Sequence, residues 1–214
     1  MRLVRFPALA ACALGVATIS ATVSATASAS EIRLGVTYPG QTGEITSNST
    51  LGGTTSSGGW SQGMRGNVDY LWTIPLVIVG FSFGPGVSVD TRKGTAEGSD
   101  LEYRAYSGHL SAGPYFAIIP SVLKLELMGF AGVGTADLKA TTSGTSQSQS
   151  SRYTEYGANL NVVVAVPVVG LEAGAGVGWL SSTSDQPSTK GGTNVQYQVK
   201  NGAPTYNIFV GYRF

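Results

Sequence analysis

Hydrophobic and polar side chains alternate over most of the chain, and the last ten residues show this pattern most clearly. The opposite face of that segment is polar, apart from Phe209. Side chains of an extended strand point alternately to its two sides, so such a segment has one apolar and one polar face. An apolar outer face, a polar inner face and aromatic residues at the rim are what a strand of a lipid-facing barrel requires. The apolar face carries Tyr206, Ile208, Val210, Tyr212 and Phe214.

Three similar segments each place a proline inside an apolar stretch, at Pro75, Pro120 and Pro167. Proline cannot donate a hydrogen bond to a strand ladder, so each segment predicts a short turn. Longer polar stretches lie between these turns and predict four loops, at about residues 39–62, 91–100, 137–152 and 182–194. Short turns at one end and long extracellular loops at the other are typical of outer-membrane barrels. A soluble β-sandwich is the alternative, but it does not require this one-sided asymmetry.

Three turns and four loops connect eight strands, and the sequence therefore predicts an all-β, eight-stranded, antiparallel up-and-down transmembrane barrel. The predicted fourth strand does not keep its apolar side chains on one face. Leu101 and Tyr103 match one face, whereas Leu110 and Phe116 match the other. A β-bulge near residues 106–108 would repair this pattern, because an extra residue re-aims every side chain after it. The strands are expected at about 31–38, 63–74, 77–90, 101–117, 122–135, 153–166, 168–180 and 205–214.

The first 29 residues predict a cleaved secretory signal peptide. Arg2 and Arg5 precede an Ala-rich apolar run from residue 6 to about 23, and Ala27-Ser28-Ala29 provides a small-x-small cleavage site. Cleavage after Ala27 is the alternative site. Leu9-Ala10-Ala11-Cys12 also resembles a lipoprotein processing site, but the apolar run continues past the cysteine. The barrel domain is expected to span residues 30–214.

Composition narrows the function classes. Removal of residues 1–29 takes away two of the 13 basic residues and none of the 12 acidic ones, so the formal charge moves from +1 to −1. A balance this close to zero disfavours nucleic acid as a partner. Cys12 would leave with the signal, and the chain has one histidine, so we expect no disulfide, metal site or cofactor. Because no later run is long enough for a spanning helix, a membrane chain of this type must cross as a closed barrel.

The inward faces of the predicted strands collect five basic and five acidic residues. An eight-stranded barrel is only wide enough for side chains to fill its interior. Charges buried there must pair, because an unpaired buried charge costs several kcal/mol. Two interpretations follow: a sealed, salt-bridged polar core, or a narrow hydrophilic path gated by the pairs. The predicted lumen network contains Arg33, Arg65, Asp69, Glu102, Arg104, Lys124, Glu126, Glu155, Glu172 and Arg213.

One constellation is a weak candidate for catalysis. His109 and Ser111 lie two residues apart on one strand face, and Glu126 on the next strand is placed to orient the histidine. A serine hydrolase needs a base beside its nucleophile. The pair is similar to that of the outer-membrane lipid A deacylases. However, Ala112 replaces the asparagine that usually follows the serine in that family, and both side chains would face the lumen.

The chain also resembles small OmpA/OmpX-like outer-membrane barrels, including the opacity-type porin group. The signal peptide, the alternating segments and the Gly211-Tyr212-Arg213-Phe214 ending carry this resemblance. It implies an integral protein of the outer membrane of a Gram-negative bacterium, in contact with outer-membrane lipid and lipopolysaccharide. It also implies that the barrel-assembly machinery recognises Tyr212 and Phe214, and that loops contact an extracellular ligand. The sequence thus favours a non-enzymatic structural or surface-interaction role, with a narrow pore as the alternative and a lipid A-modifying hydrolase as the less favoured one.

Overall fold

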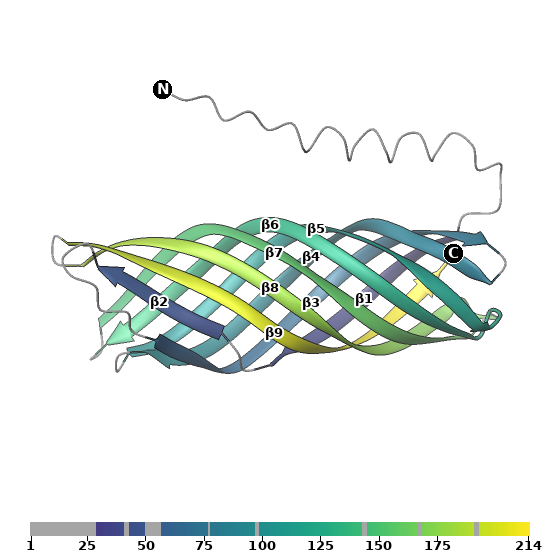
Figure 1. Ribbon diagram of the computed structural model, residues 1–214, viewed down its shortest axis with the longest axis horizontal. Coiled ribbons are helices and arrows are strands. Elements are labelled where there is room, and N and C mark those ends of the chain that lie inside the picture. The colour runs from purple at the N-terminus through teal and green to yellow at the C-terminus, as the bar shows by residue number, and fades with distance from the viewer. Residues whose placement is uncertain are drawn as a thin grey trace, which may run out of the picture.

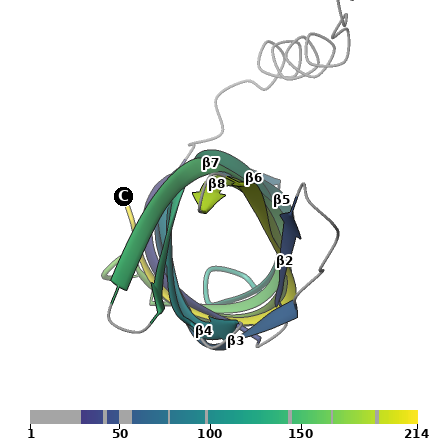
Figure 2. The ribbon, with the colours of Figure 1, turned by 90° about the vertical axis from the view of Figure 1, so that its left-hand side faces the viewer.

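The computed structural model describes residues 29–40, 43–49, 57–76, 78–96, 99–142, 145–166, 168–190 and 193–214. The predicted signal peptide lies outside the described residues, apart from Ala29. Antiparallel pairing joins the strands into a ring around a central lumen (Figures 1 and 2). The strands are β1 (Ala29–Pro39), β2 (Gly43–Ser49), β3 (Ser57–Leu76), β4 (Val79–Ala96), β5 (Ser99–Ile119), β6 (Leu123–Thr142), β7 (Thr145–Val166), β8 (Leu171–Lys190) and β9 (Thr193–Arg213).

The ring has eight positions because β1 and β2 share one of them. Both strands pair with β3 on one side and with β9 on the other. The two strands hold the same register against β9, so β2 continues the path of β1. The backbone amides of Ser30 and Phe214 donate to each other's carbonyl oxygens, at 3.0 and 2.9 Å, and join the two ends of the described chain. The predicted eight-stranded up-and-down barrel is confirmed.

Both ends of the described chain lie at the same end of the barrel as the three short connections, and we call this the turn end (Figure 1). The opposite end is the distal end. Two of the described residues in the short connections hold a left-handed backbone: Ser121, with a φ of 62°, and Gly170, with a φ of 67°. Glycine tolerates this conformation without steric cost, so Gly170 suits the connection between β7 and β8. No helix that could span a membrane is present among the described residues.

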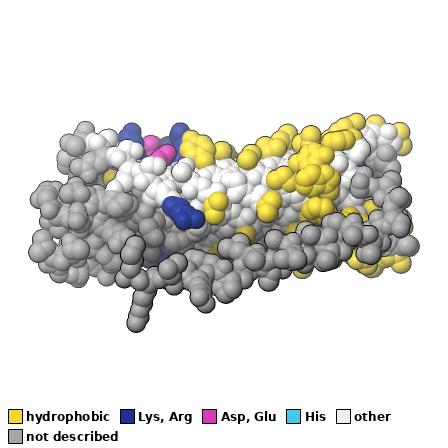
Figure 3. All heavy atoms as spheres, turned by 90° about the horizontal axis from the view of Figure 1, so that it is seen from above, with side chains coloured by type: hydrophobic (Ala, Val, Ile, Leu, Met, Phe, Trp, Pro, Cys, Tyr) yellow, Lys and Arg dark blue, Asp and Glu magenta, His cyan; other side chains and the backbone are white. Residues whose placement is uncertain are grey.

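An apolar belt covers the outside of the barrel over the part nearer the turn end (Figure 3). Its strands alternate as the sequence predicts, with Leu34, Val162 and Ile208 among the outward side chains. Tyr206 on β9 and Phe214, directly after that strand, lie eight residues apart, which corresponds to about 20 Å along the barrel axis for a tilted strand. Exposed aromatic side chains mark the two limits of the belt. They are Tyr38, Tyr106, Tyr156, Trp179 and Tyr206 toward the distal end, and Trp72, Phe81, Phe116, Tyr212 and Phe214 at the turn end.

Strand geometry continues far beyond this belt. Strands β3 to β9 each run for 18 to 22 residues. About 9–11 residues are enough for a strand to cross a bilayer. The four long loops are therefore wrong in extent, because most residues predicted there continue the sheet. Ser- and Thr-rich segments suit an exposed strand as well as a loop, and the backbone gains ladder hydrogen bonds. We name the strand segments beyond the distal aromatic residues the collar: 43–49, 57–63, 90–96, 99–105, 134–142, 145–155, 180–190 and 193–205.

The collar reverses the polarity of the belt. Leu101, Tyr103 and Ala105 point into the lumen, while Glu102 and Arg104 are exposed outside. The β-bulge predicted near residues 106–108 is wrong, because β5 pairs with both neighbours there without a register shift. The alternation of inward and outward side chains does not change along β5 between Leu101 and Phe116. What changes is the surroundings, since the outer face meets lipid in the belt and water in the collar.

Candidate functional site: the charged lumen

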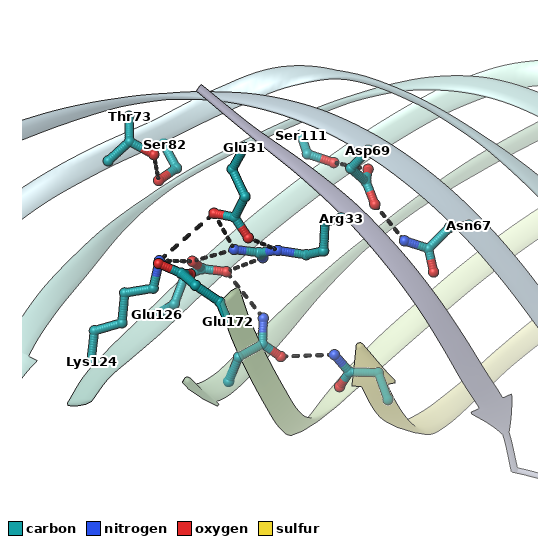
Figure 4. Close-up of polar contacts among 12 residues, drawn as sticks. Glu31, Arg33, Asn67, Asp69, Thr73, Ser82, Ser111, Lys124, Glu126 and Glu172 are labelled. Atoms are coloured by element: carbon teal, nitrogen blue, oxygen red, sulfur yellow. Dashed lines mark hydrogen bonds and ion pairs between the residues drawn. The ribbon is translucent and has the colours of Figure 1, made fainter. Parts of the chain in front are cut away.

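Buried ionic side chains fill the lumen near the turn end (Figure 4). Arg33 Nε contacts Glu31 Oε1 at 2.9 Å, and Arg33 Nη1 contacts Glu126 Oε1 at 2.7 Å. Lys124 Nζ lies 2.7 Å from Glu172 Oε2 and 3.8 Å from Glu31 Oε2. These contacts come from strands on different sides of the ring. The turn-end network, as we call it, consists of Glu31, Arg33, Lys124, Glu126, Glu172 and Arg213, the last paired with Glu172.

The surroundings of Phe209 explain why this apolar residue lies on the polar face of the last strand. It points inward, and the Arg33 guanidinium lies 4.1 Å from the centre of its ring. Gly174 faces Phe209 on β8, and any side chain there would overlap the ring. An aromatic face attracts a cation by about 0.5–2 kcal/mol, so Phe209 helps to hold Arg33 in the lumen.

A small polar cavity of about 60 Å³ lies distal to this network. A volume of this size accommodates a few water molecules. Thr205 Oγ1 and Asn207 Oδ1 are buried lining atoms without a hydrogen-bond partner among the described residues. Water is the natural partner for such atoms, because an unsatisfied buried polar group costs about 1–3 kcal/mol. The lining also includes Arg33, Arg65, Asp69, His109, Ser111, Asn159 and Asn161.

A second ionic cluster, the middle network, bounds the cavity on its distal side. Arg65 forms a two-pronged ion pair with Glu155. Glu155 also accepts hydrogen bonds from Ser107 Oγ at 2.6 Å and from the Tyr153 hydroxyl at 2.9 Å. His109 Nε2 lies 2.7 Å from Asp69 Oδ1. The members of this network come from β3, β5 and β7, so it crosses the lumen in several directions.

An apolar cluster lies in the lumen inside the collar. Trp60 donates from its ring nitrogen to Asn201 Oδ1 at 2.9 Å, and the Tyr103 hydroxyl donates to Ser184 at 3.3 Å. Burial raises the pKa of the Tyr103 hydroxyl, and burial together with the Glu155 carboxylate raises that of Tyr153. Nearby, Arg92 pairs with Asp90 at 2.8 Å. The cluster contains Trp60, Leu101, Tyr103, Ala105, Ala136, Leu138, Tyr153 and Val199.

The structure places eight of the ten predicted network residues in the lumen. The prediction is wrong for Glu102 and Arg104, which lie outside the collar, where Glu102 contacts Lys93 at 3.7 Å. Among the residues whose burial the structure describes, the prediction missed three buried charged ones: Glu31, Asp90 and Arg92. All three were detectable. Glu31 has the parity of Arg33, and Asp90 and Arg92 continue the inward parity of β4 once that strand is extended to Ala96.

The catalytic hypothesis does not fit the geometry. Glu126 binds Arg33 and Asn161, so it does not orient His109. His109 and Ser111 instead both approach the same oxygen of Asp69, at 2.7 and 3.5 Å. A hydrolase requires the histidine between the acid and the serine, whereas here the acid lies between the other two. No group of three His, Cys, Asp or Glu residues within the described ranges is arranged to hold a metal ion.

Comparison with known proteins supports the fold. No protein-family model and no curated protein sequence matches the chain. The structure of a major outer membrane protein from Thermus thermophilus is 12% identical and aligns over 88% of this chain and 100% of that chain, with a TM-score of 0.51. Ail of Yersinia pestis, solved with the heparin analogue sucrose octasulfate, is 20% identical over 88% and 100% of the two chains, with a TM-score of 0.44. Neisserial surface protein A is 17% identical over 87% and 99%, with a TM-score of 0.43.

Proposed function

We propose that this chain, a barrel with the fold of integral outer-membrane proteins, acts without catalysis as a sealed membrane scaffold. It holds a rigid, water-facing collar at the cell surface for contact with an extracellular partner. The observation that carries this proposal is the reversal of polarity between belt and collar. Strands that are apolar outside and charged inside become polar outside, with an apolar cluster inside beside the Asp90–Arg92 pair, within one continuous sheet.

The reversal supports a collar outside the membrane, because the outer face of the belt suits lipid and the outer face of the collar suits water. Apolar side chains face lipid in the belt, where an outward Arg or Lys at mid-membrane would cost about 2–4 kcal/mol. In the collar, Arg104, Lys139 and Arg152 are exposed on the outer face, together with Glu102. The apolar cluster inside then stabilises the projecting sheet as a hydrophobic core would. A paired sheet is a stiffer platform than a loop of equal length.

Cysteine labelling tests this arrangement, since the mature chain is expected to contain no cysteine of its own. Lys139→Cys lies on the collar, Leu127→Cys in the belt and Val168→Cys in a short connection at the turn end. A membrane-impermeant maleimide should label Lys139→Cys on intact cells and Val168→Cys only after permeabilisation. Leu127→Cys should resist the reagent in both cases. Labelling of Val168→Cys on intact cells would contradict the proposed orientation.

Contact with a partner has a separate test. Removing matched residues from the β6–β7 hairpin between Ala136 and Ser151, which are cross-strand partners, shortens the collar and leaves the belt intact. Cells that display the full barrel should adhere to glycan-coated or matrix-coated surfaces more than cells with the shortened barrel at equal expression. Equal adherence would argue against a binding role for the collar.

A narrow pore is the second candidate function, and the polar cavity of about 60 Å³ favours it. Polar space between two ionic networks offers an intermediate position for water or small ions. The networks on both sides of it and the apolar cluster inside the collar weigh against continuous flow. Electrical recording distinguishes the two functions.

A further inference from the structure

His109 occupies a place in the lumen that its neighbours leave open for it. The cross-strand partners of His109 are Gly86 on β4 and Gly132 on β6. A Cβ atom on Gly86 would overlap the imidazole, and one on Gly132 would lie 2.7 Å from His109 Cβ. The imidazole therefore lies against bare backbone on both sides, and 6% of the residue is exposed. The ring centres of His109 and Phe130 lie 6.0 Å apart in a T-shaped arrangement.

Each ring nitrogen of this imidazole faces a carboxylate. Nε2 lies 2.7 Å from Asp69 Oδ1 on β3, and Nδ1 lies 3.8 Å from Glu155 Oε1 on β7. A neutral imidazole carries one N–H and one lone pair. It can satisfy Asp69, but its lone pair then points toward Glu155. Nδ1 is indeed buried without a hydrogen-bond partner among the described residues. A doubly protonated imidazole presents an N–H to both carboxylates.

The pairing of the other lumen carboxylates also favours a doubly protonated His109. Each of the other five buried carboxylates contacts an arginine or a lysine: Glu31, Asp90, Glu126, Glu155 and Glu172. Asp69 differs, because within the described chain its one cationic partner is His109. Its remaining contacts are neutral, from Asn67 and from Ser111. Burial of a carboxylate without a cation costs several kcal/mol, so Asp69 depends on the charge of His109.

We infer that His109 is the cation that neutralises Asp69, so that Asp69, His109 and Glu155 form a proton-dependent latch across the middle of the lumen. The latch ties β3 to β5 and β5 to β7. Arg65 faces the same carboxylate as His109 and offsets part of the negative charge of Glu155. Loss of the proton leaves Asp69 as an unpaired carboxylate beside the polar cavity.

Histidine occurs once in the whole sequence, so NMR of imidazole-labelled, tag-free protein in micelles reports this residue alone. The wild-type imidazole should keep its second proton to a higher pH than the imidazole of Asp69→Asn. The matched control is Ser82→Ala, which removes another buried lumen side chain, bonded to Thr73 and not to His109. Ser82→Ala should titrate like wild type. A wild-type imidazole that is neutral throughout, or that titrates at the same pH as in Asp69→Asn, would overturn the inference.

Stability gives a second readout with a definite sign. An unperturbed histidine loses its proton near pH 6.5. Because the latch requires the doubly protonated imidazole, its stabilisation should be lost once His109 has given up that proton. The unfolding midpoint on heat-modifiability gels should therefore fall for wild type as pH rises from about 5 to 9. His109→Gln should be flat across this range and as unstable as wild type at its alkaline end, and adding Asp69→Asn should restore part of the loss. A pH-independent wild type would contradict the latch.

Discussion

Arg33 and Glu126 lie 93 residues apart in the chain, yet Arg33 Nη1 donates to Glu126 Oε1 across the lumen at 2.7 Å. A second bond from Arg33 Nη2 to Glu126 Oε2, at 3.1 Å, makes the pair two-pronged. Bonds of this geometry fix distance and orientation together. The turn-end network thus joins β1 to β6 through the interior, where sheet pairing does not connect them.

Glu126→Gln should destabilise the barrel by about 3 kcal/mol, because it removes one carboxylate from a buried pair and leaves Arg33 with Glu31 alone. Glu102→Gln is the matched control. It removes a carboxylate from the exposed side of the collar and should change stability by no more than about 0.5 kcal/mol. Unfolding in urea measures both.

The double variant Arg33→Met with Glu126→Gln separates pairing from simple loss of contacts. Its cost should be smaller than the summed costs of the two single variants, because no unpaired charge remains from this pair. Strict additivity would mean that water reaches both side chains and that the turn end is open.

Substitution of an outward residue by arginine should cost much more in the lipid-facing belt than in the collar. Val162 lies outward near the middle of the belt, and Val162→Arg should cost about 2–4 kcal/mol. Thr154→Arg introduces the same side chain on the same face of β7, but in the collar, and should be nearly neutral. Refolding yields and urea midpoints in lipid vesicles test the pair. Similar costs at both positions would place the membrane boundary elsewhere.

Phe214 should matter for assembly. Its backbone closes the ring against Ser30, and its ring lies 6.2 Å from Tyr212 and 6.3 Å from Tyr70. Deleting Phe214 should lower the amount of folded protein in cells. Phe116→Ala, which removes another exposed aromatic of the turn end, should reduce the yield less. Pulse-chase assembly with a heat-modifiability readout compares the two, and equal yields would remove the special role of the terminal residue.

Alkaline pH should weaken the collar. Burial raises the pKa of Tyr103 in the folded protein, whereas an unfolded tyrosine ionises near pH 10. The folded state thus holds the phenol proton more tightly, and the free energy of unfolding should fall as pH rises above about 10. Tyr103→Phe should reduce this pH dependence. Tyrosinate absorbance gives a check, since the signal that Tyr103→Phe removes should appear well above pH 10; its appearance near pH 10 would indicate an open collar.

The belt was predictable from sequence because lipid imposes one rule on every strand. Alternation placed Leu34 outward and Arg33 inward correctly, as in the structure. The same rule failed in the collar, where water surrounds the outer face. Glu102 and Arg104 were placed inside because charge was taken to mark the lumen. The apparent parity change on β5 marked the edge of the membrane, and was interpreted as a bulge.

Pairing inside the lumen could not be predicted in the same way. Alternation states which side of the wall a residue faces, but not its partner across the ring. Glu126 is a cross-strand neighbour of Tyr115 and Asn161, yet its ionic partner is Arg33 on distant β1. The role of Asp69 beside His109 was missed for this reason, since strand β4 separates β3 from β5 in the sheet.

Single-channel recording of refolded wild-type protein in planar bilayers tests the central claim most directly. The claim is that paired charges and the apolar cluster seal the lumen, so that the protein acts through its collar. The account predicts a silent bilayer after confirmed insertion, at voltages of both signs. Stable, reproducible conductance steps from wild-type protein, altered in Arg33→Met with Glu126→Gln, would contradict it and favour the pore.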